Sequence, residues 1–230
     1  MELKIKNISV TEIKSDLLIV NLFEGTLTPG GATGAVDKEI SGLISDYVIK
    51  KEGFTGEFGK MYVLPVPNHK ILTKVLIVGL GKRDEFDLNR LRVLASKVIQ
   101  KVKTMENVKT VVSMLHGAGC AGFDPYQCAK VIAEGTMIGG FAFDKYKSDA
   151  KQKVKTFTIA EIDKKNFEKA QEGFERGLLV GDTVNYARDL IMEPAQNITP
   201  SHLAEIAENL DLTEVKVLSL IHISEPTRPY

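Results

Sequence analysis

The 230-residue chain has no tryptophan, two cysteines and four histidines. Cys120 and Cys128 are eight residues apart, which is neither a zinc-knuckle nor a redox spacing. Two cysteines do not make the disulfide framework of a small secreted domain, so we expect reduced thiols in a cytoplasmic protein. The histidines form no His-x-x-x-His pair, and no Gly-x-Ser-x-Gly elbow is present. Both absences exclude the hydrolase classes that depend on those motifs.

An excess of either charge is also missing, because thirty basic side chains balance thirty acidic ones. A balanced chain has no electrostatic footprint for nucleic acid or an anionic membrane, so we predict neither partner. No apolar run approaches the roughly 20 residues that span a bilayer. The first residues, Met-Glu-Leu-Lys-Ile-Lys, alternate charged and apolar side chains and lack the apolar region of a signal peptide.

Apolar patterning predicts strands that alternate with helices. The period-two and continuous apolar runs indicate strands, and apolar residues at helical spacing indicate amphipathic helices. The expected strands are 3–10, 17–22, 59–65, 74–78, 108–115 and 154–160, and the expected helices are 35–51, 86–105, 124–139, 167–192 and 200–209. Such alternation predicts an α/β fold with a mixed or parallel sheet covered on both faces.

Two glycine-rich segments have a structural and a ligand-binding interpretation. Residues 75–81, Val-Leu-Ile-Val-Gly-Leu-Gly, end in Gly-x-Gly, but Asp84 stands where a dinucleotide fingerprint needs a third glycine. We therefore expect a tight turn from a strand to a helix there. Residues 30–34, Gly-Gly-Ala-Thr-Gly, precede a helix and offer backbone N–H groups to an anion. Packing of glycine in a turn is the favoured interpretation, and anion binding stays open.

Residues 185–200 carry the most specific pattern, Asn-Tyr-Ala-Arg-Asp-Leu-Ile-Met-Glu-Pro-Ala-Gln-Asn-Ile-Thr-Pro. This segment resembles the start of the catalytic domain of the leucyl (cytosol) aminopeptidases, a family of two-metal exopeptidases. Residues 77–81 and 134–147 resemble blocks in the N-terminal domain of the same family. The aromatic residues Phe141, Phe143 and Tyr146 of the second block are expected to be packing residues. We expect Arg188 and Asp189 to form a structural ion pair.

The resemblance implies the removal of N-terminal residues from peptides by a homo-hexamer that binds two divalent metals (zinc, manganese or magnesium). It also implies that the metal ligands and the catalytic residues follow residue 200. We therefore assign no catalytic, cofactor-binding or metal-binding residue to this chain. The expected plan is a macro-like domain at 1–160, a linker helix at 161–184 and the start of a truncated catalytic domain at 185–217.

Residues 218–228 resemble the in-frame translation of a transposon-end sequencing adapter, so we expect 218–230 to be a non-native tail. The other interpretation is a genuine proline-containing terminus. The alternative function for the chain as a whole is a macro-like binding module for ADP-ribose or a related phosphate ligand. The glycine-rich residues 30–34 are similar to the phosphate loop of macro domains.

Overall fold

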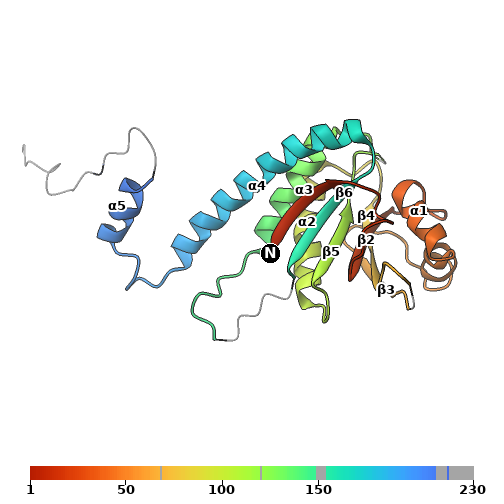
Figure 1. The fold of residues 1–230 in the computed structure, drawn as a ribbon, viewed down its shortest axis with the longest axis horizontal. Helices are drawn as coiled ribbons and strands as arrows, with labels where there is room; N and C mark the ends of the chain where they lie inside the picture. The colour runs from red at the N-terminus through yellow and green to blue at the C-terminus, as the bar shows by residue number, and fades with distance from the viewer. Residues whose placement is uncertain (68, 120, 149–153, 211–216, 218–230) are drawn as a thin grey trace, which may run out of the picture. The chain divides into compact units, whose positions relative to one another are not determined.

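The computed structural model describes residues 1–67, 69–119, 121–148, 154–210 and 217 (Figure 1). The chain divides into two compact units, Met1–Asn185 and Tyr186–Tyr230. Cys120 and the tail at 218–230 lie outside the described residues.

A six-stranded mixed sheet in the order β1-β6-β5-β2-β4-β3 forms the centre of the first unit. Its strands are β1 (Glu2–Asn7), β2 (Leu17–Phe23), β3 (Met61–Pro65), β4 (Lys74–Gly81), β5 (Thr110–Met114) and β6 (Thr156–Glu161). The edge strand β3 pairs antiparallel with β4, and the other neighbouring strands pair parallel. The expected α/β sheet is confirmed.

Burial follows the order of the strands in the sheet. All seven residues of the central strand β2 are buried, as its continuous apolar run predicts. The edge strand β1 has no buried residue and carries Lys4 and Lys6. Charged side chains on an edge strand oppose pairing with another chain.

Helices cover both faces of the sheet, because successive side chains of a strand point to opposite faces. Leu18 and Val20 of β2 pack in one cluster with Val36 of α1 (Gly31–Glu39) and Ile44 of the π-helical segment η1 (Leu43–Ile49). Leu17 and Ile19 pack in a second cluster with residues of α2 (Leu88–Thr104) and α3 (Pro125–Gly140). Figure 1 shows α1 on one side of the sheet and α2 and α3 on the other.

The single helix expected at 35–51 is wrong. Helix α1 begins earlier, at Gly31, and is separated from η1 by Ser41 and Gly42, which have φ angles of 59° and 77°. The cause is the buried carboxylate of Asp37, which accepts hydrogen bonds from Ile44 N (2.7 Å) and Ser45 N (3.2 Å) and from Ser45 Oγ. A side chain that binds the backbone several residues ahead offers an alternative to a continuous helix.

Three glycines bring α4 (Lys164–Met192) into close contact with α3 within the first unit. An added Cβ would lie 2.9 Å from Tyr126 Cα at Gly173, 2.8 Å from Ala133 Cβ at Gly177, and 2.5 Å from Met137 Cβ at Gly181. The three residues are four apart and so share one face of the helix. Glycine therefore permits this contact without interrupting α4, contrary to its usual effect on a helix.

The described part of the second unit contains the end of α4 and the helix α5 (Pro200–Glu208). Thr199 is the N-cap of α5, and its side chain accepts a hydrogen bond from His202 N, as expected from Thr-Pro at this position. No residue of α5 is buried. Among the described residues, no helix has both the length and the apolar character needed to cross a membrane.

Candidate functional site

The sheet reverses its winding between β2 and β5. The chain leaves β2 toward α1 on one face and leaves β5 toward α3 on the opposite face. In open α/β sheets, ligands bind outside the carboxyl ends of the strands at such a switch point. A ligand-binding or catalytic site of this domain is therefore expected among the side chains at this point.

A buried hydrogen-bonded network joins the two strands there. The His116 ring follows β5 and lies with Nδ1 2.6 Å from Asn21 Nδ2 and with Nε2 2.9 Å from Ser113 Oγ. Thr33, near the start of α1, donates its hydroxyl to the Asn21 carbonyl oxygen at 2.8 Å. These groups connect β2 and α1 to the end of β5; Asn21 and His116 are 95 residues apart in sequence.

The network has the residue types of a Ser-His-Asn triad, but the hydrogen bond between its serine and histidine runs in the opposite direction. Because the Asn21 amide donates to Nδ1, the proton of the imidazole is on Nε2 and points at Ser113 Oγ. The serine hydroxyl in turn donates to the Met114 carbonyl oxygen at 3.1 Å. A nucleophilic serine needs the opposite arrangement, in which histidine accepts its proton.

Burial also argues against a catalytic role for Ser113 and His116. Ser113 is 1% exposed and His116 is 7% exposed, so a peptide cannot reach either side chain. Burial lowers the pKa of His116 to about 4, so the ring is neutral at physiological pH. A neutral, enclosed imidazole acts as a structural hydrogen-bonding group.

The glycine-rich segment 30–34 forms the N-terminus of α1 beside this network. Gly30 and Gly31 are exposed, and Gly31 has a φ of 55°. An added Cβ at Gly34 would lie 2.6 Å from Pro29 O, so packing explains this glycine. Binding of a phosphate ligand to the exposed backbone stays a prediction.

The second glycine pair, Gly79 and Gly81, lies at the end of β4, which continues to Gly81 and not only to Val78 as expected. The expected turn from the strand to a helix follows directly, between Gly81 and the start of α2 at Leu88. Segment 56–60 pairs with this part of the strand: Gly79 N donates to Lys60 O at 2.8 Å, and Gly81 N donates to Gly56 O at 2.9 Å. An added Cβ would lie 2.6 Å from Gly56 O at Gly79, and 2.9 Å from Phe58 Cβ at Gly81. These glycines serve close packing rather than nucleotide binding.

The family-like block at 134–147 begins with a buried carboxylate. Glu134 Oε2 accepts a hydrogen bond from Arg92 Nε at 2.7 Å, which joins α3 to α2. The rings of Phe143 and Tyr146 are in contact at a centroid distance of 5.9 Å, tilted by 57° to each other. Tyr146 is 56% exposed, so its packing with Phe143 lies at the surface rather than in the core.

The family-like segment at 185–200 spans the end of α4 and the start of α5. Asn185 Nδ2 donates to Met137 O at 3.0 Å, which ties this residue to α3. Arg188 and Asp189 are consecutive residues of α4, and side chains one position apart do not face each other on a helix. Their ion pair stays a prediction.

The described residues do not fit a two-metal centre. Nowhere in the described ranges do three side chains of His, Cys, Asp or Glu come close enough to hold one metal ion. We therefore assign no metal-dependent step to these residues.

Reasoning from the sequence missed Asn21 and Ser113 as members of the buried network around His116, and it missed Arg92 as the partner of the buried Glu134. It also missed Thr136, whose buried hydroxyl has no hydrogen-bond partner among the described residues. The available signal was a polar residue within a continuous apolar strand, as at Asn21 in Leu-Leu-Ile-Val-Asn-Leu-Phe. Such a residue needs a buried partner. The partner of Asn21 is 95 residues away, which no local pattern indicates.

The fold and the site together define a macro-like α/β domain whose polar centre is structural. A macrodomain of Trypanosoma brucei, solved in complex with ADP, has a similar fold: the TM-score is 0.58 at 12% identity, covering 75% of this chain and 68% of that one. A mutant of tomato leucine aminopeptidase has a TM-score of 0.68 at 21% identity, covering 90% of this chain and 41% of that one.

Sequence comparison gives the family. The profile described as "Cytosol aminopeptidase family, N-terminal domain" matches residues 19–150. A probable cytosol aminopeptidase of Sulfurihydrogenibium sp. (strain YO3AOP1) is 30% identical over 212 residues, which are 91% of this chain and 41% of that protein. The chain belongs to the cytosol aminopeptidase family and contains its N-terminal domain. It spans about two fifths of the length of that relative.

Proposed function

We propose that this chain is the N-terminal part of a cytosolic two-metal aminopeptidase and that it supports assembly and regulation rather than catalysis. The observation that carries the proposal is the family match, which falls on the N-terminal domain and leaves most of the relative's length outside the alignment. The remainder of the protein would supply the metal ligands and remove N-terminal residues from peptides.

The domain plan belongs to the same proposal. Residues 1–160 form the macro-like domain, 161–184 form a linker helix, and 185–217 begin the catalytic domain. The complete protein is a homo-hexamer in the cytoplasm and binds two divalent ions, which are zinc, manganese or magnesium. The contact between α3 and the glycines of α4 supports a linker helix that is packed on the macro-like domain within the first unit.

The test is hydrolysis of a leucine chromogenic substrate by the purified chain with added Mn²⁺ or Zn²⁺. We expect no turnover above a control without protein. A second purification by an unrelated method excludes a contaminating peptidase. Turnover that survives both purifications and scales with the concentration of the chain would overturn the proposal.

Binding of ADP-ribose is tested in parallel by thermal shift. The proposal predicts an unchanged unfolding midpoint at millimolar ADP-ribose, whereas a ligand at 100 times its Kd stabilises a protein by about 2.7 kcal/mol. A saturable rise in the midpoint would favour the macro-like binding module instead.

A further inference from the structure

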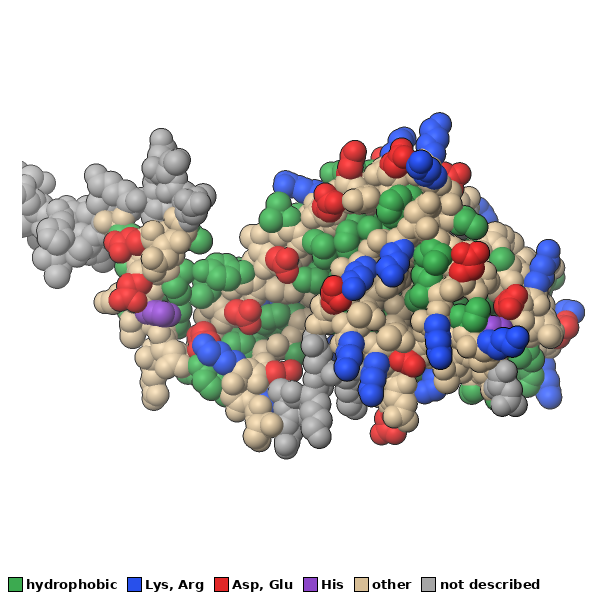
Figure 2. Space-filling view, in the orientation of Figure 1, with side chains coloured by type: hydrophobic (Ala, Val, Ile, Leu, Met, Phe, Trp, Pro, Cys, Tyr) green, Lys and Arg blue, Asp and Glu red, His purple; other side chains and the backbone are tan. Residues whose placement is uncertain are grey.

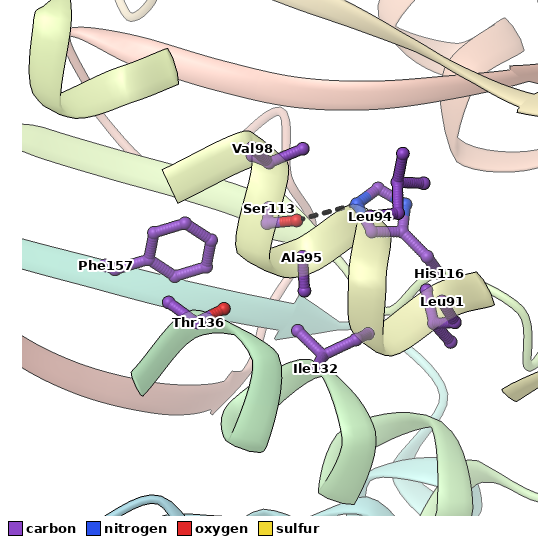
Figure 3. A pocket seen from close by; sticks show the side chains of 9 residues that line it. All are labelled: Leu91, Leu94, Ala95, Val98, Ser113, His116, Ile132, Thr136 and Phe157. Carbon is purple, nitrogen blue, oxygen red and sulfur yellow. Dashed lines mark hydrogen bonds between the residues drawn. The ribbon is translucent and has the colours of Figure 1, made fainter. Parts of the chain in front are cut away.

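A small cavity lies among α2, α3, β5 and β6 in the first unit (Figure 3). Its volume is about 10 Å³, close to the minimum that holds one water molecule. Leu94, Val98, Ile132 and Phe157 supply apolar walls. Three of the residues that line it, Ser113, His116 and Thr136, have polar side chains.

The buried Thr136 hydroxyl indicates that the cavity binds a molecule. Thr136 is 0% exposed, and its Oγ1 has no hydrogen-bond partner among the residues that the structure describes. Buried hydroxyl groups in folded proteins are nearly always paired, with protein or with ordered water. Figure 3 shows this side chain on α3, among the residues that line the cavity.

Ser113 has one hydrogen-bonding position left over. A hydroxyl has one donor and two acceptor positions. The donor of Ser113 is used by Met114 O at 3.1 Å, and one acceptor position is used by His116 Nε2 at 2.9 Å. The second acceptor position can receive a hydrogen bond from a molecule in the cavity.

We propose that the cavity binds one water molecule that bridges Thr136 Oγ1 of α3 and Ser113 Oγ of β5. Water fits because it is neutral, donates and accepts, and matches the volume. An ion does not fit, because apolar walls leave its charge without compensation. A larger molecule is excluded by the volume. The bridging water connects α3 to the Asn21–His116 network at the switch point of the sheet.

The direct test is a crystal structure of the whole chain at about 1.8 Å resolution. We expect a spherical density peak within hydrogen-bond distance, about 2.6–3.2 Å, of both hydroxyl oxygens. Density that is empty at this position would overturn the proposal, whatever the outcome of the peptidase assay.

Two variants test the same site in solution. Thr136→Val keeps the shape of the side chain and removes the hydroxyl, and Thr136→Ser keeps the hydroxyl as the matched control. If water is bound, Thr136→Val removes a hydrogen bond and lowers the unfolding midpoint by about 2–4 °C. If the hydroxyl is dry and unpaired, the same change removes an unfavourable group, so an unchanged or higher midpoint would contradict the proposal. Thr136→Ser should retain the density peak.

Discussion

The contact between α3 and α4 predicts that Gly177→Ala destabilises the protein, although alanine is the better helix former. The new Cβ would lie 2.8 Å from Ala133 Cβ, whereas carbon atoms pack at about 3.5–4.0 Å. The helices must therefore separate by roughly 0.7 Å, and overpacking of this kind costs about 1–3 kcal/mol. The gain in helix propensity is about 1 kcal/mol. We expect a net loss of up to about 2 kcal/mol.

Thermal unfolding measured by circular dichroism tests this estimate. For a chain of this size, the expected loss lowers the unfolding midpoint by up to about 8 °C. Gly140→Ala is the control, since its Cβ would lie 3.4 Å from Met1 Cε and 3.6 Å from Ile99 Cγ1, which are ordinary distances to side chains. The reasoning is refuted if Gly177→Ala raises the midpoint as an unhindered helical glycine would.

Three other predictions follow from buried groups. Burial lowers the pKa of His116 from 6.5 to about 4, so the unfolded chain binds more protons between these values. Keeping the ring neutral therefore contributes about 3 kcal/mol to the free energy of unfolding above pH 6.5, and this contribution is lost as the pH falls toward 4. His116→Gln should flatten this part of a plot of the urea-unfolding free energy against pH. Asp37→Ala leaves Ile44 N and Ser45 N without their acceptor and should cost about 2–4 kcal/mol in urea unfolding, with a smaller loss for Asp37→Asn. A chain ending at residue 160 should fold but melt below one ending at 185, because only the longer chain buries Ala170 and Phe174; an unfolded shorter chain would place the proposed boundary elsewhere.

Surface charge contributes little to these effects. Figure 2 shows basic and acidic side chains interspersed over the visible face of residues 1–185. The exposed pairs Lys50–Asp46 and Lys60–Glu57 are screened by solvent, so each is expected to add little to the stability. The buried groups above therefore give the clearer measurements.

Apolar periodicity predicted the elements whose stability depends on one buried face. In α2, the inner residues Leu91, Leu94, Ala95, Val98, Ile99 and Val102 are buried as their spacing indicates. Apolar periodicity gave the wrong bounds where tertiary contacts determine the backbone conformation. Asp37 divides the helix expected at 35–51, and pairing with segment 56–60 explains why β4 extends through Gly81.

The candidate site was less predictable than the fold. Asn21 and His116 are 95 residues apart and meet because β2 and β5 are neighbours in the sheet. Neither residue belongs to a local motif that would pair it with the other. Recognition of the family depended instead on a continuous local pattern at 185–200, which a single sequence does reveal.

The most direct test of the account is the DNA sequence of the source gene beyond codon 217. The account predicts that the reading frame continues without residues 218–230 to about the length of the curated relatives. The continuation would contain Lys, Asp and Glu residues that hold two metal ions. A source gene that encodes residues 218–230 and then stops would contradict the proposal that this chain is part of a longer aminopeptidase.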